Sequence, residues 1–363
     1  YGRKPVLLVS QLGTLVGFVV LGLAGALWVL FLARLIDGLS GANISTAQAV
    51  ISDSTNEKTR TQGLGLLGAA FGIGFVFGPV IAFVSLAASN NNFHVPAYVA
   101  AGFSLLSILL TFFWLEETHP AGSEKSIGKQ TPLSFSVMWQ ALRSPAVGML
   151  LILMFVQQIA FGGFEQLLSL FTLNRLGMDA SGNSVLFVFV GIIVVAVQGY
   201  FIGRWSKRFG DRWLIRLGLG ALAMGLLLTA FTPSQPVPWY SRQQLMVELN
   251  GTRSLPGETP PTQNLQISIP QNAQKGWLGL AWLMIAMVPA AIGGGLLQPT
   301  INSLITRRVD ASEVGGMLGI SAALLSGANA VAPVLGGAIF QGLGASVPFL
   351  AGGALLAVLY LAV

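Results

Sequence analysis

Residues 63–85 read GLGLLGAAFGIGFVFGPVIAFVS and carry no charged side chain. About 20 mainly apolar residues are enough for a helix to cross the hydrocarbon core of a bilayer. Residues 319–333 repeat the pattern, because a glycine and a proline again stand fourteen positions apart, as Gly65 and Pro79 do, with many small residues between them. A repeated apolar helix predicts both insertion into a membrane and a chain built from two related halves.

The composition of the whole chain also predicts a membrane protein. Of 363 residues, 53% are hydrophobic and only 9% are charged, whereas a soluble domain carries about 25% charged residues. So much apolar surface must face lipid or neighbouring buried helices. The ten predicted spans are Pro5–Ala26, Leu27–Ile51, Gly63–Ser85, Pro96–Leu115, Pro145–Leu170, Asn183–Gly203, Trp213–Phe231, Trp277–Ile305, Gly316–Phe340 and Ser346–Val363.

The chain lacks the residues that several kinds of chemistry require. Cysteine is absent, which excludes disulfides, thiolate catalysis and cysteine-based metal sites. The two histidines, His94 and His119, fall in separate predicted loops, so we expect no metal centre and no cofactor. The predicted spans hold no clustered His, Asp and nucleophilic Ser of the kind that a membrane-embedded enzyme needs. We therefore expect a protein that is not an enzyme.

The basic residues gather at one end of the predicted spans. Fourteen of the 19 Lys and Arg residues fall in alternate loops or beside them. An excess of Lys and Arg marks cytoplasmic loops, so this end is predicted to be cytoplasmic, and the formal charge of +6 requires no nucleic acid as partner. The fourteen are Arg3, Lys4, Lys58, Arg60, Lys125, Lys129, Arg143, Arg204, Lys207, Arg208, Arg212, Arg216, Arg307 and Arg308.

A second pair of similar stretches supports the internal repeat. Tyr1–Leu8 and Phe209–Arg216 each begin with an aromatic residue, a glycine and two charged residues, and each leads into a helix. Their offset is 208 residues, against 254 residues for the glycine-rich helices, and the polar, proline-rich insert Thr232–Gly276 accounts for the difference. The predicted units are an N-terminal half (1–115), a cytoplasmic linker (116–144) and a C-terminal half (145–363) with its outer insert at 232–276.

The residues at the two ends of the sequence lead us to expect further chain on either side. Tyr1–Lys4 is a basic turn, and such a turn normally follows a preceding span. We therefore expect one or two further helices upstream of this sequence. Val363 lies within an apolar run, so we expect more chain downstream as well.

Four short motifs, in order along the chain, resemble those of the major facilitator superfamily. Tyr1-Gly2-Arg3-Lys4-Pro5 resembles the end of the loop motif Gly-x-x-x-Asp-Arg-x-Gly-Arg-Lys, and Arg34-Leu-Ile-Asp37-Gly38 resembles an Arg-x-x-x-Gly signature. Gly74-Phe-Val-Phe-Gly78-Pro79 resembles the antiporter signature Gly-x-x-x-Gly-Pro, and Leu115-Glu116-Glu117-Thr118 resembles the Pro-Glu-Thr that often ends the sixth helix. Within the superfamily, the chain is most similar to twelve-helix drug:proton antiporters of the tetracycline-efflux type.

The resemblance implies a fold, although the sequence departs from the family's motifs at several positions. It implies an all-α polytopic membrane protein with two pseudo-symmetric helical halves, of which about ten of twelve transmembrane helices lie in this chain. Ala82-Phe83 stands where the family has a glycine pair. Lys207 and Asp211 depart from the loop motif of the second half, which expects an acidic and a basic residue at these positions.

Glycines, a proline and basic residues are candidates for gating and helix packing. Small residues let helix backbones approach closely and proline bends a helix, so Gly74, Gly78 and Pro79 predict a tight seam between two moving halves. The resemblance implies gate ion pairs for Arg3 and Lys4. The full set is Gly2, Arg3, Lys4, Gly74, Gly78, Pro79, Gly210 and Arg212.

Three charged residues lie well inside predicted spans, where each costs at least about 2.5 kcal/mol to insert. Arg34 and Asp37 share one helix face, and the pair serves either proton coupling or substrate binding, or else is a structural ion pair near a helix end. Glu165 shares a face with Gln158. It lies either beside a wet cavity, where it would carry the coupling proton, or near the outer water interface.

Two amides complete the set of candidate pathway residues. Gln298 and Asn302 stand four apart on one predicted helix, beside Pro299. Such uncharged amides either hydrogen-bond a polar solute or join neighbouring helices. The predicted substrate and proton pathway therefore consists of Arg34, Asp37, Gln158, Glu165, Gln298 and Asn302.

These features predict a secondary active transporter in the cell membrane. Two halves would rock about a central cavity, and a proton gradient would drive export of a small, amphipathic compound from a monomer embedded in the bilayer. The first alternative is a facilitator-type importer of a sugar or organic anion, against which the sparse polar residues and the antiporter-like Gly74–Pro79 argue. A membrane-embedded enzyme and a non-transporting receptor are the less favoured alternatives.

Overall fold

The structure, a computed structural model, describes residues 2–41, 43–56, 58–89, 92, 94–118, 135–178, 180–243, 245, 270, 274–310 and 313–362. The cytoplasmic linker and the outer insert are thus described only in part. Tyr1, His119 and the central residues of both segments lie outside the described residues.

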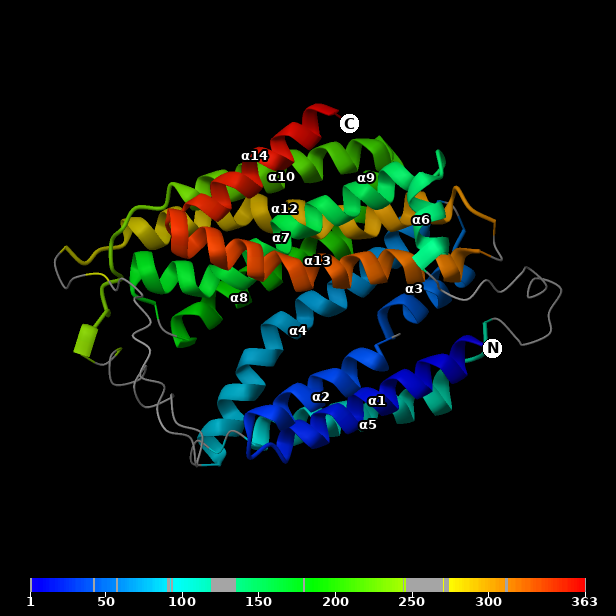
Figure 1. The fold of residues 1–363 in the computed structure, drawn as a ribbon, viewed down its shortest axis with the longest axis horizontal. Helices are drawn as coiled ribbons and strands as arrows, with labels where there is room; N and C mark the ends of the chain where they lie inside the picture. The colour runs from blue at the N-terminus through cyan, green and yellow to red at the C-terminus, as the bar shows by residue number, and fades with distance from the viewer. Residues whose placement is uncertain are drawn as a thin grey trace.

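The described residues form α-helices and one π-helix, η2 (Figure 1). The first helices are α1 (Arg3–Gly22), α2 (Leu27–Leu39), α3 (Asn43–Ser54), α4 (Arg60–Ala88), α5 (His94–Trp114) and α6 (Phe135–Arg143). The later ones are α7 (Gly148–Leu176), α8 (Ala180–Ala196), η2 (Val197–Phe201), α9 (Ile202–Phe209), α10 (Asp211–Ala230), α12 (Leu278–Thr306), α13 (Val314–Leu343) and α14 (Val347–Ala362).

All ten predicted apolar segments are helical. Nine helical stretches in the described part of the chain are long and apolar enough to cross a membrane, and α14 is a shorter apolar helix. The prediction of an all-α polytopic membrane protein is confirmed. The predicted end of the fifth segment at Leu170 was six residues short, because α7 continues to Leu176 and stops where Gly177 adopts the left-handed conformation (φ 63°).

Two of the predicted spans are interrupted helices rather than continuous ones. The segment predicted as Leu27–Ile51 breaks between α2 and α3, because the Ser40 hydroxyl hydrogen-bonds the Ile36 carbonyl (2.9 Å) and competes with the helical pattern. The segment predicted as Asn183–Gly203 contains η2 between α8 and α9 and runs on to Phe209. Gly210 then turns the chain into α10 with φ at 81°.

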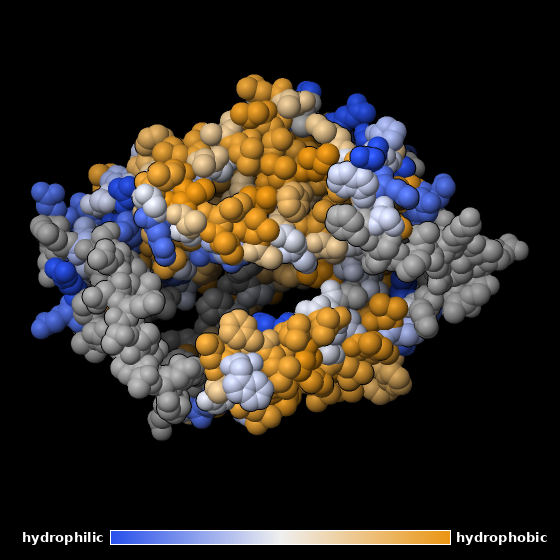
Figure 2. Space-filling view, in the orientation of Figure 1, coloured by the Kyte–Doolittle hydropathy of each residue, from blue (hydrophilic) through white to orange (hydrophobic). Residues whose placement is uncertain are grey.

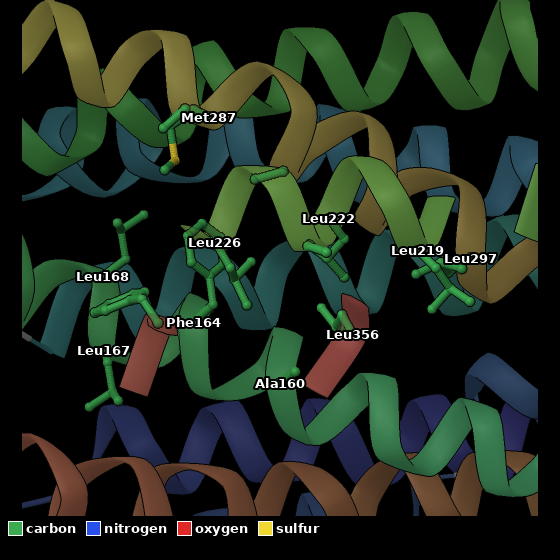
Figure 3. Close-up of a cluster of buried hydrophobic side chains, with 14 of the residues drawn as sticks. Ala160, Phe164, Leu167, Leu168, Leu219, Leu222, Leu226, Met287, Leu297 and Leu356 are labelled. Atoms are coloured by element: carbon green, nitrogen blue, oxygen red, sulfur yellow. The ribbon is translucent and has the colours of Figure 1, made fainter. Parts of the chain in front are cut away.

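The helices after the linker, α7 to α14, form a densely packed group that we call the C-terminal group. More than half of the apolar window (56%) is buried in each of α7, α10 and α12. Figure 3 shows the centre of this core, where Phe164 of α7, Leu226 of α10, Met287 of α12 and Leu356 of α14 point toward one another. Helix α10 lies between α12 and α14, and α13 packs along α7 (Figure 1).

The helices α1 to α5, which we call the N-terminal group, bury far less of their apolar surface. The buried share of the apolar window is 6% to 22% in these helices. Helix α1 lies between α2 and α5. Helix α4 runs diagonally from these three helices toward the C-terminal group (Figure 1). The exposed apolar side chains, among them Phe31, Phe113 and Trp114, suit a surface that faces lipid rather than water.

A cavity of about 670 Å³ lies within the N-terminal group, between α1, α3, α4 and α5. Its lining is mainly apolar, with Gln11, Thr14 and Asn43 among its few polar side chains.

Candidate functional site

The two groups of helices meet where the inner halves of α4 and α8 pack together. We call the end of the bundle that carries the Lys and Arg excess the inner end, and the opposite end the outer end. A Cβ atom added at Gly68 would lie 2.0 Å from Oε1 of Gln198, and one at Gly72 would lie 2.8 Å from Cγ2 of Val195. At Gly72 the added atom would also lie 3.1 Å from the Gly191 carbonyl oxygen, so glycine lets the two backbones approach closely and the helices form a seam between the groups.

The same two helices separate beyond Gly72, toward the outer end. Gly74 and Gly78 lie on the opposite face of α4 from Gly72, where Gly78 lines the cavity of the N-terminal group, and a Cβ atom at either would meet no atom within 4 Å. Phe77 and Val80, on the same stretch of α4, are exposed. Figure 2 shows a hollow between the two groups on the visible face, and Figure 1 shows α4 leaving α8 at this level. The groups are therefore in contact at the inner end and apart at the outer end.

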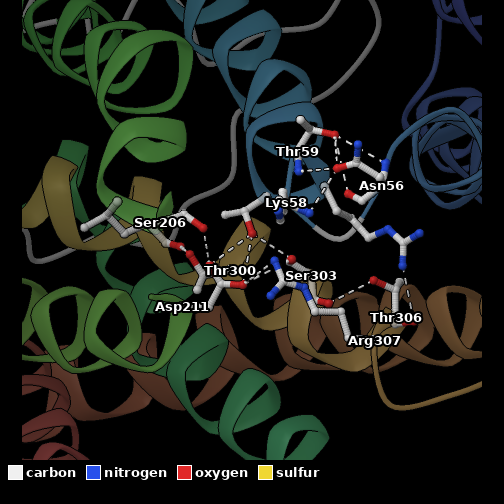
Figure 4. Close-up of polar contacts among 12 residues, drawn as sticks. Asn56, Lys58, Thr59, Ser206, Asp211, Thr300, Ser303, Thr306 and Arg307 are labelled. Carbon is white, nitrogen blue, oxygen red and sulfur yellow. Dashed lines mark hydrogen bonds and ion pairs between the residues drawn. The ribbon is translucent and has the colours of Figure 1, made fainter. Parts of the chain in front are cut away.

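A buried carboxylate lies at the inner end of this seam. Asp211 is the first residue of α10, and its side chain is only 2% exposed. It forms an ion pair with Arg307 (3.0 Å) and accepts a hydrogen bond from Ser206 (2.5 Å). The Thr61 hydroxyl lies 3.1 Å from both carboxylate oxygens and 2.7 Å from the Ser303 hydroxyl. We call these five residues the Asp211 cluster (Figure 4).

The Asp211 cluster joins the two groups of helices. Thr61 belongs to α4, whereas the other four residues belong to α9, α10 and α12 or to the residue that follows α12. Arg60 adds a hydrogen bond from its guanidinium to the Thr306 carbonyl (3.5 Å). A carboxylate is also favourable at the N-terminus of α10, where it complements the helix dipole. Asp211 thus belongs to the inner contact, although the sequence marked it only as a departure from a motif.

The predicted stripe on α7 faces α13. The side-chain amide of Gln158 donates a hydrogen bond to Oδ1 of Asn329 (2.9 Å), and Gln166 donates to the Asn329 carbonyl (3.4 Å). Asn329 was not among the predicted residues, although it is the only amide in the predicted span Gly316–Phe340, and that rarity was the available signal. Gly162 allows this approach, because a Cβ there would lie 2.8 Å from Oδ1 of Asn329.

Glu165 lies one turn farther along α7 than this amide pair. Its side chain is half-buried, and it makes no hydrogen bond or ion pair with any residue that the structure describes. The preceding residue, Phe164, is 8% exposed and packs into the core of the C-terminal group. A charge inside a span is costly, so Glu165 remains a candidate for function.

Arg34 and Asp37 lie together on α2, as their spacing predicts. Their ion pair is long, at 3.9 Å, and the side chains are 55% and 34% exposed. The Arg34 guanidinium also lies over the Phe18 ring, 5.9 Å from its centroid. The pair sits on the N-terminal group and Glu165 on the C-terminal group, so the structure places the predicted intramembrane charges on both groups.

The amides at the centre of the C-terminal group include one that the sequence did not single out. Asn302 is only 1% exposed, and its Oδ1 has no partner among the described residues, while Gln298 is half-buried one turn earlier. Gln198 in η2 donates to the Gly295 carbonyl (2.7 Å), and its Oε1 is likewise unpartnered. π-Helices are frequent at functional sites. The interruption that creates η2 leaves no sequence pattern, which is why Gln198 was missed.

The candidates for gating lie in three places: the start of α1, the turn before α10, and α4. Arg3 pairs with Asp53 (3.0 Å) and reaches α13, where a Cβ at Gly315 would lie 2.4 Å from its guanidinium. The Glu117 carboxylate accepts hydrogen bonds from the backbone N–H groups of Arg3 (2.7 Å) and Lys4 (3.0 Å), beside Gly2. Gly210 and the exposed Arg212 flank Asp211, and Gly74, Gly78 and Pro79 lie on the part of α4 that leaves α8.

Comparison with known proteins identifies relatives of this chain. The family model described as Major Facilitator Superfamily matches residues 1–250. The chain is similar to the tetracycline resistance protein, class B, of Escherichia coli, with 24% identity over 343 residues that cover 94% of this chain and 73% of that protein. It is similar to the class C protein of Escherichia coli at 28% identity over 342 residues, with the same two coverages.

A solved structure resembles the fold. The crystal structure of the human organic anion transporter MFSD10 (TETRAN) aligns with a TM-score of 0.72 and 19% sequence identity, covering 99% of this chain and 76% of that one. At this identity the likeness concerns the fold alone. The helices, the family model and the relatives agree on a multi-pass transporter of the cell membrane that moves small molecules and is not an enzyme. This chain belongs to the Major Facilitator Superfamily.

Proposed function

We propose that this protein exports small amphipathic compounds, including drugs, in exchange for protons. It works as a monomer in which residues 1–115 and 145–363, joined by the linker 116–144, rock against each other. One observation carries the proposal: α4 packs against α8 at Gly72 and against η2 at Gly68, whereas toward the outer end a hollow separates the two groups of helices (Figure 2). A transporter that alternates access needs one closed end and one open end at a time.

The substrate class is supported by the relatives and by the chemistry of the C-terminal group. The two relatives described above bear the name tetracycline resistance protein. Helix α7 carries the half-buried ring of Phe161 about one turn from the amide of Gln158, which pairs with Asn329 of α13. Such a mixture suits a planar, amphipathic molecule, because mainly apolar walls bury the ligand and a few polar groups orient it.

The proton is carried by carboxyl groups at membrane depth. Glu165 has no partner in the described part of the chain, so its charge state is set by water and substrate in the hollow rather than by a fixed cation. Asp37 stands 3.9 Å from Arg34, and this carboxylate is the second proton site that we propose. Rocking changes both surroundings and thereby couples proton release to substrate movement.

Gating is proposed to use the inner contacts already described. Arg3, with Lys4 and Gly2 at the start of α1, closes the inner end against Gly315 of α13. Gly210 and Arg212 hold the turn that presents Asp211 to Thr61. Gln298 and Asn302 on α12 join Gln158 along the pathway, while Pro79 lies in the stretch of α4 that changes partners.

The test is transport by the full natural protein in proteoliposomes. An imposed pH gradient is expected to drive accumulation of a fluorescent amphipathic dye or of tetracycline. Glu165→Gln and Asp37→Asn are each expected to abolish the gradient-driven part of the uptake, because neither amide can take up or release a proton. Glu116→Gln serves as the matched control, because Glu116 lies beyond the end of α5 and outside the spans.

Two outcomes would overturn the proposal. Uptake that is the same with and without the gradient would remove proton coupling. Full gradient-driven uptake by both the Glu165→Gln and the Asp37→Asn variants would remove these residues from the pathway. A loss of uptake in the Glu116→Gln control would show that general damage to the protein, rather than loss of a proton site, explains the result.

A further inference from the structure

Five basic side chains crowd the turn between α9 and α10 at the inner end. All five are exposed, and the stretch from residue 204 to residue 216 contains a single acidic residue. Figure 2 shows hydrophilic residues gathered at the end of the bundle where Figure 1 places α9. We call this cluster the basic turn, and its members are Arg204, Lys207, Arg208, Arg212 and Arg216.

The one acidic residue of this stretch does not neutralise the basic turn. Asp211 is buried and points into the cluster with Thr61 and Arg307. Within the described residues Arg208 and Arg212 form no ion pair, and Arg204 donates only to the Tyr200 carbonyl (3.1 Å). The turn therefore presents a local excess of positive charge to its surroundings.

Exposed aromatic rings lie among these cations. The Arg204 guanidinium stacks on Tyr200 at 3.7 Å from the ring centroid, and Arg208 lies 5.3 Å from the centroid of Phe209. The rings of Phe209 and Trp213 are 4.5 Å apart. Exposed Tyr and Trp mark the level of the lipid headgroups in a membrane protein, because one side of the ring is apolar and the other polar.

Other cations at the inner end are used within the protein. Arg3 pairs with Asp53, Arg307 pairs with Asp211, and Arg308 donates to the Ala146 carbonyl (2.7 Å). Topology alone requires only an excess of Lys and Arg in the inner loops. It does not require that Arg204 and Arg208, which form no ion pair within the described residues, lie over exposed aromatic rings.

We propose that the basic turn binds the headgroup of an anionic phospholipid in the inner leaflet. The guanidinium groups of Arg208 and Arg212 would hold the lipid phosphate by paired hydrogen bonds, which is the geometry that guanidinium favours. The rings of Tyr200 and Trp213 would pack against the glycerol and the first carbons of the acyl chains. This inference is independent of proton coupling and of the substrate.

Native mass spectrometry of the delipidated, detergent-solubilised protein tests the proposal. The probes are phosphatidylglycerol and phosphatidylcholine, titrated separately. Each cation near an anionic lipid contributes about 1 kcal/mol, or about fivefold in affinity. Arg208→Gln/Arg212→Gln is therefore expected to weaken phosphatidylglycerol binding about 25-fold and to leave phosphatidylcholine binding unchanged. The matched control Lys58→Gln/Arg308→Gln removes the same charge elsewhere at the inner end and is expected to bind as the unaltered protein does.

Two further measurements test the proposal even if the glutamine variant does not fold. Arg208→Lys/Arg212→Lys keeps the charge and is expected to retain preference for phosphatidylglycerol with reduced affinity. Raising the ionic strength from about 0.1 M to about 1 M shortens the screening length from about 10 Å to about 3 Å and should weaken the binding. Equal affinity for both lipids in the unaltered protein, or an equal loss in the control variant, would overturn the assignment.

Discussion

At the scale of single residues, the inner contact depends on Asp211. Its carboxylate accepts hydrogen bonds from Thr61 and Ser206 and forms an ion pair with Arg307. Thr61 is the only member of the cluster that comes from the N-terminal group. Thr61 and Asp211 are 150 positions apart. No local pattern in the sequence links residues that far apart, so the cluster could not be predicted before the fold was known.

Removing the charge of Asp211 is expected to weaken the inner contact. Breaking a buried pair by removing one partner costs about 3–5 kcal/mol, and the partial exposure of Arg307 (28%) lowers our expectation for Asp211→Asn to about 1–3 kcal/mol. Thermal unfolding in detergent, followed by tryptophan fluorescence, measures the loss. Asp310→Asn, an exposed neighbour of the same charge, should change stability by less than about 0.5 kcal/mol. Equal losses in the two variants would contradict the role of the cluster.

The polar residues divide into those that the sequence predicts and those that it does not. Arg34, Asp37 and Glu165 are conspicuous because a charge is rare and costly in an apolar span. Asn329 and Gln198 are uncharged and stand alone in runs of small apolar residues, so their importance depends on which helix they face. The structure supplies that information by pairing Asn329 with Gln158 and Gln198 with Gly295.

At the scale of elements, hydropathy predicts which segments are helical but not where they are interrupted. All ten segments are found, because length and apolar composition suffice to identify a span. The break at Ser40 arises from a side-chain hydrogen bond, and η2 arises where α8 packs against α4 and α12. Both depend on local geometry rather than on composition. The ends of α7 and α9 depend on the positive φ angles of Gly177 and Gly210.

Helix α4 supports a prediction that compares two nearby glycines. Gly72→Ala would place a methyl group 2.8 Å from Val195 and 3.1 Å from the backbone of Gly191, so the seam must open. Overpacking of this kind costs about 1–3 kcal/mol. Gly74→Ala meets no atom within 4 Å and should be neutral or stabilising by up to about 1 kcal/mol, because alanine favours a helix.

The measurement for this pair is thermal unfolding in detergent, followed by tryptophan fluorescence. Equal destabilisation by alanine at both glycines would contradict the seam.

At the scale of the whole molecule, the two groups of helices differ in how much they bury. The C-terminal group has a closed core, whereas the N-terminal group surrounds a cavity of about 670 Å³. Sequence could predict two related halves from the repeat, but not which end of the seam is closed. That state depends on contacts between distant segments, such as Gly68 with Gln198 and Arg3 with Gly315.

The absence of cysteine makes the closing motion directly measurable, because introduced cysteines carry no background. Spin labels at Lys58 and Asp310 report on the inner end, and labels at Ser89 and Val185 report on the outer end. Double electron–electron resonance in proteoliposomes, with and without a pH gradient, gives both distances. We predict that the inner distance lengthens in the same population in which the outer distance shortens. If both distances change in the same direction, or if neither changes under any gradient or substrate, the two groups do not rock about a shared cavity.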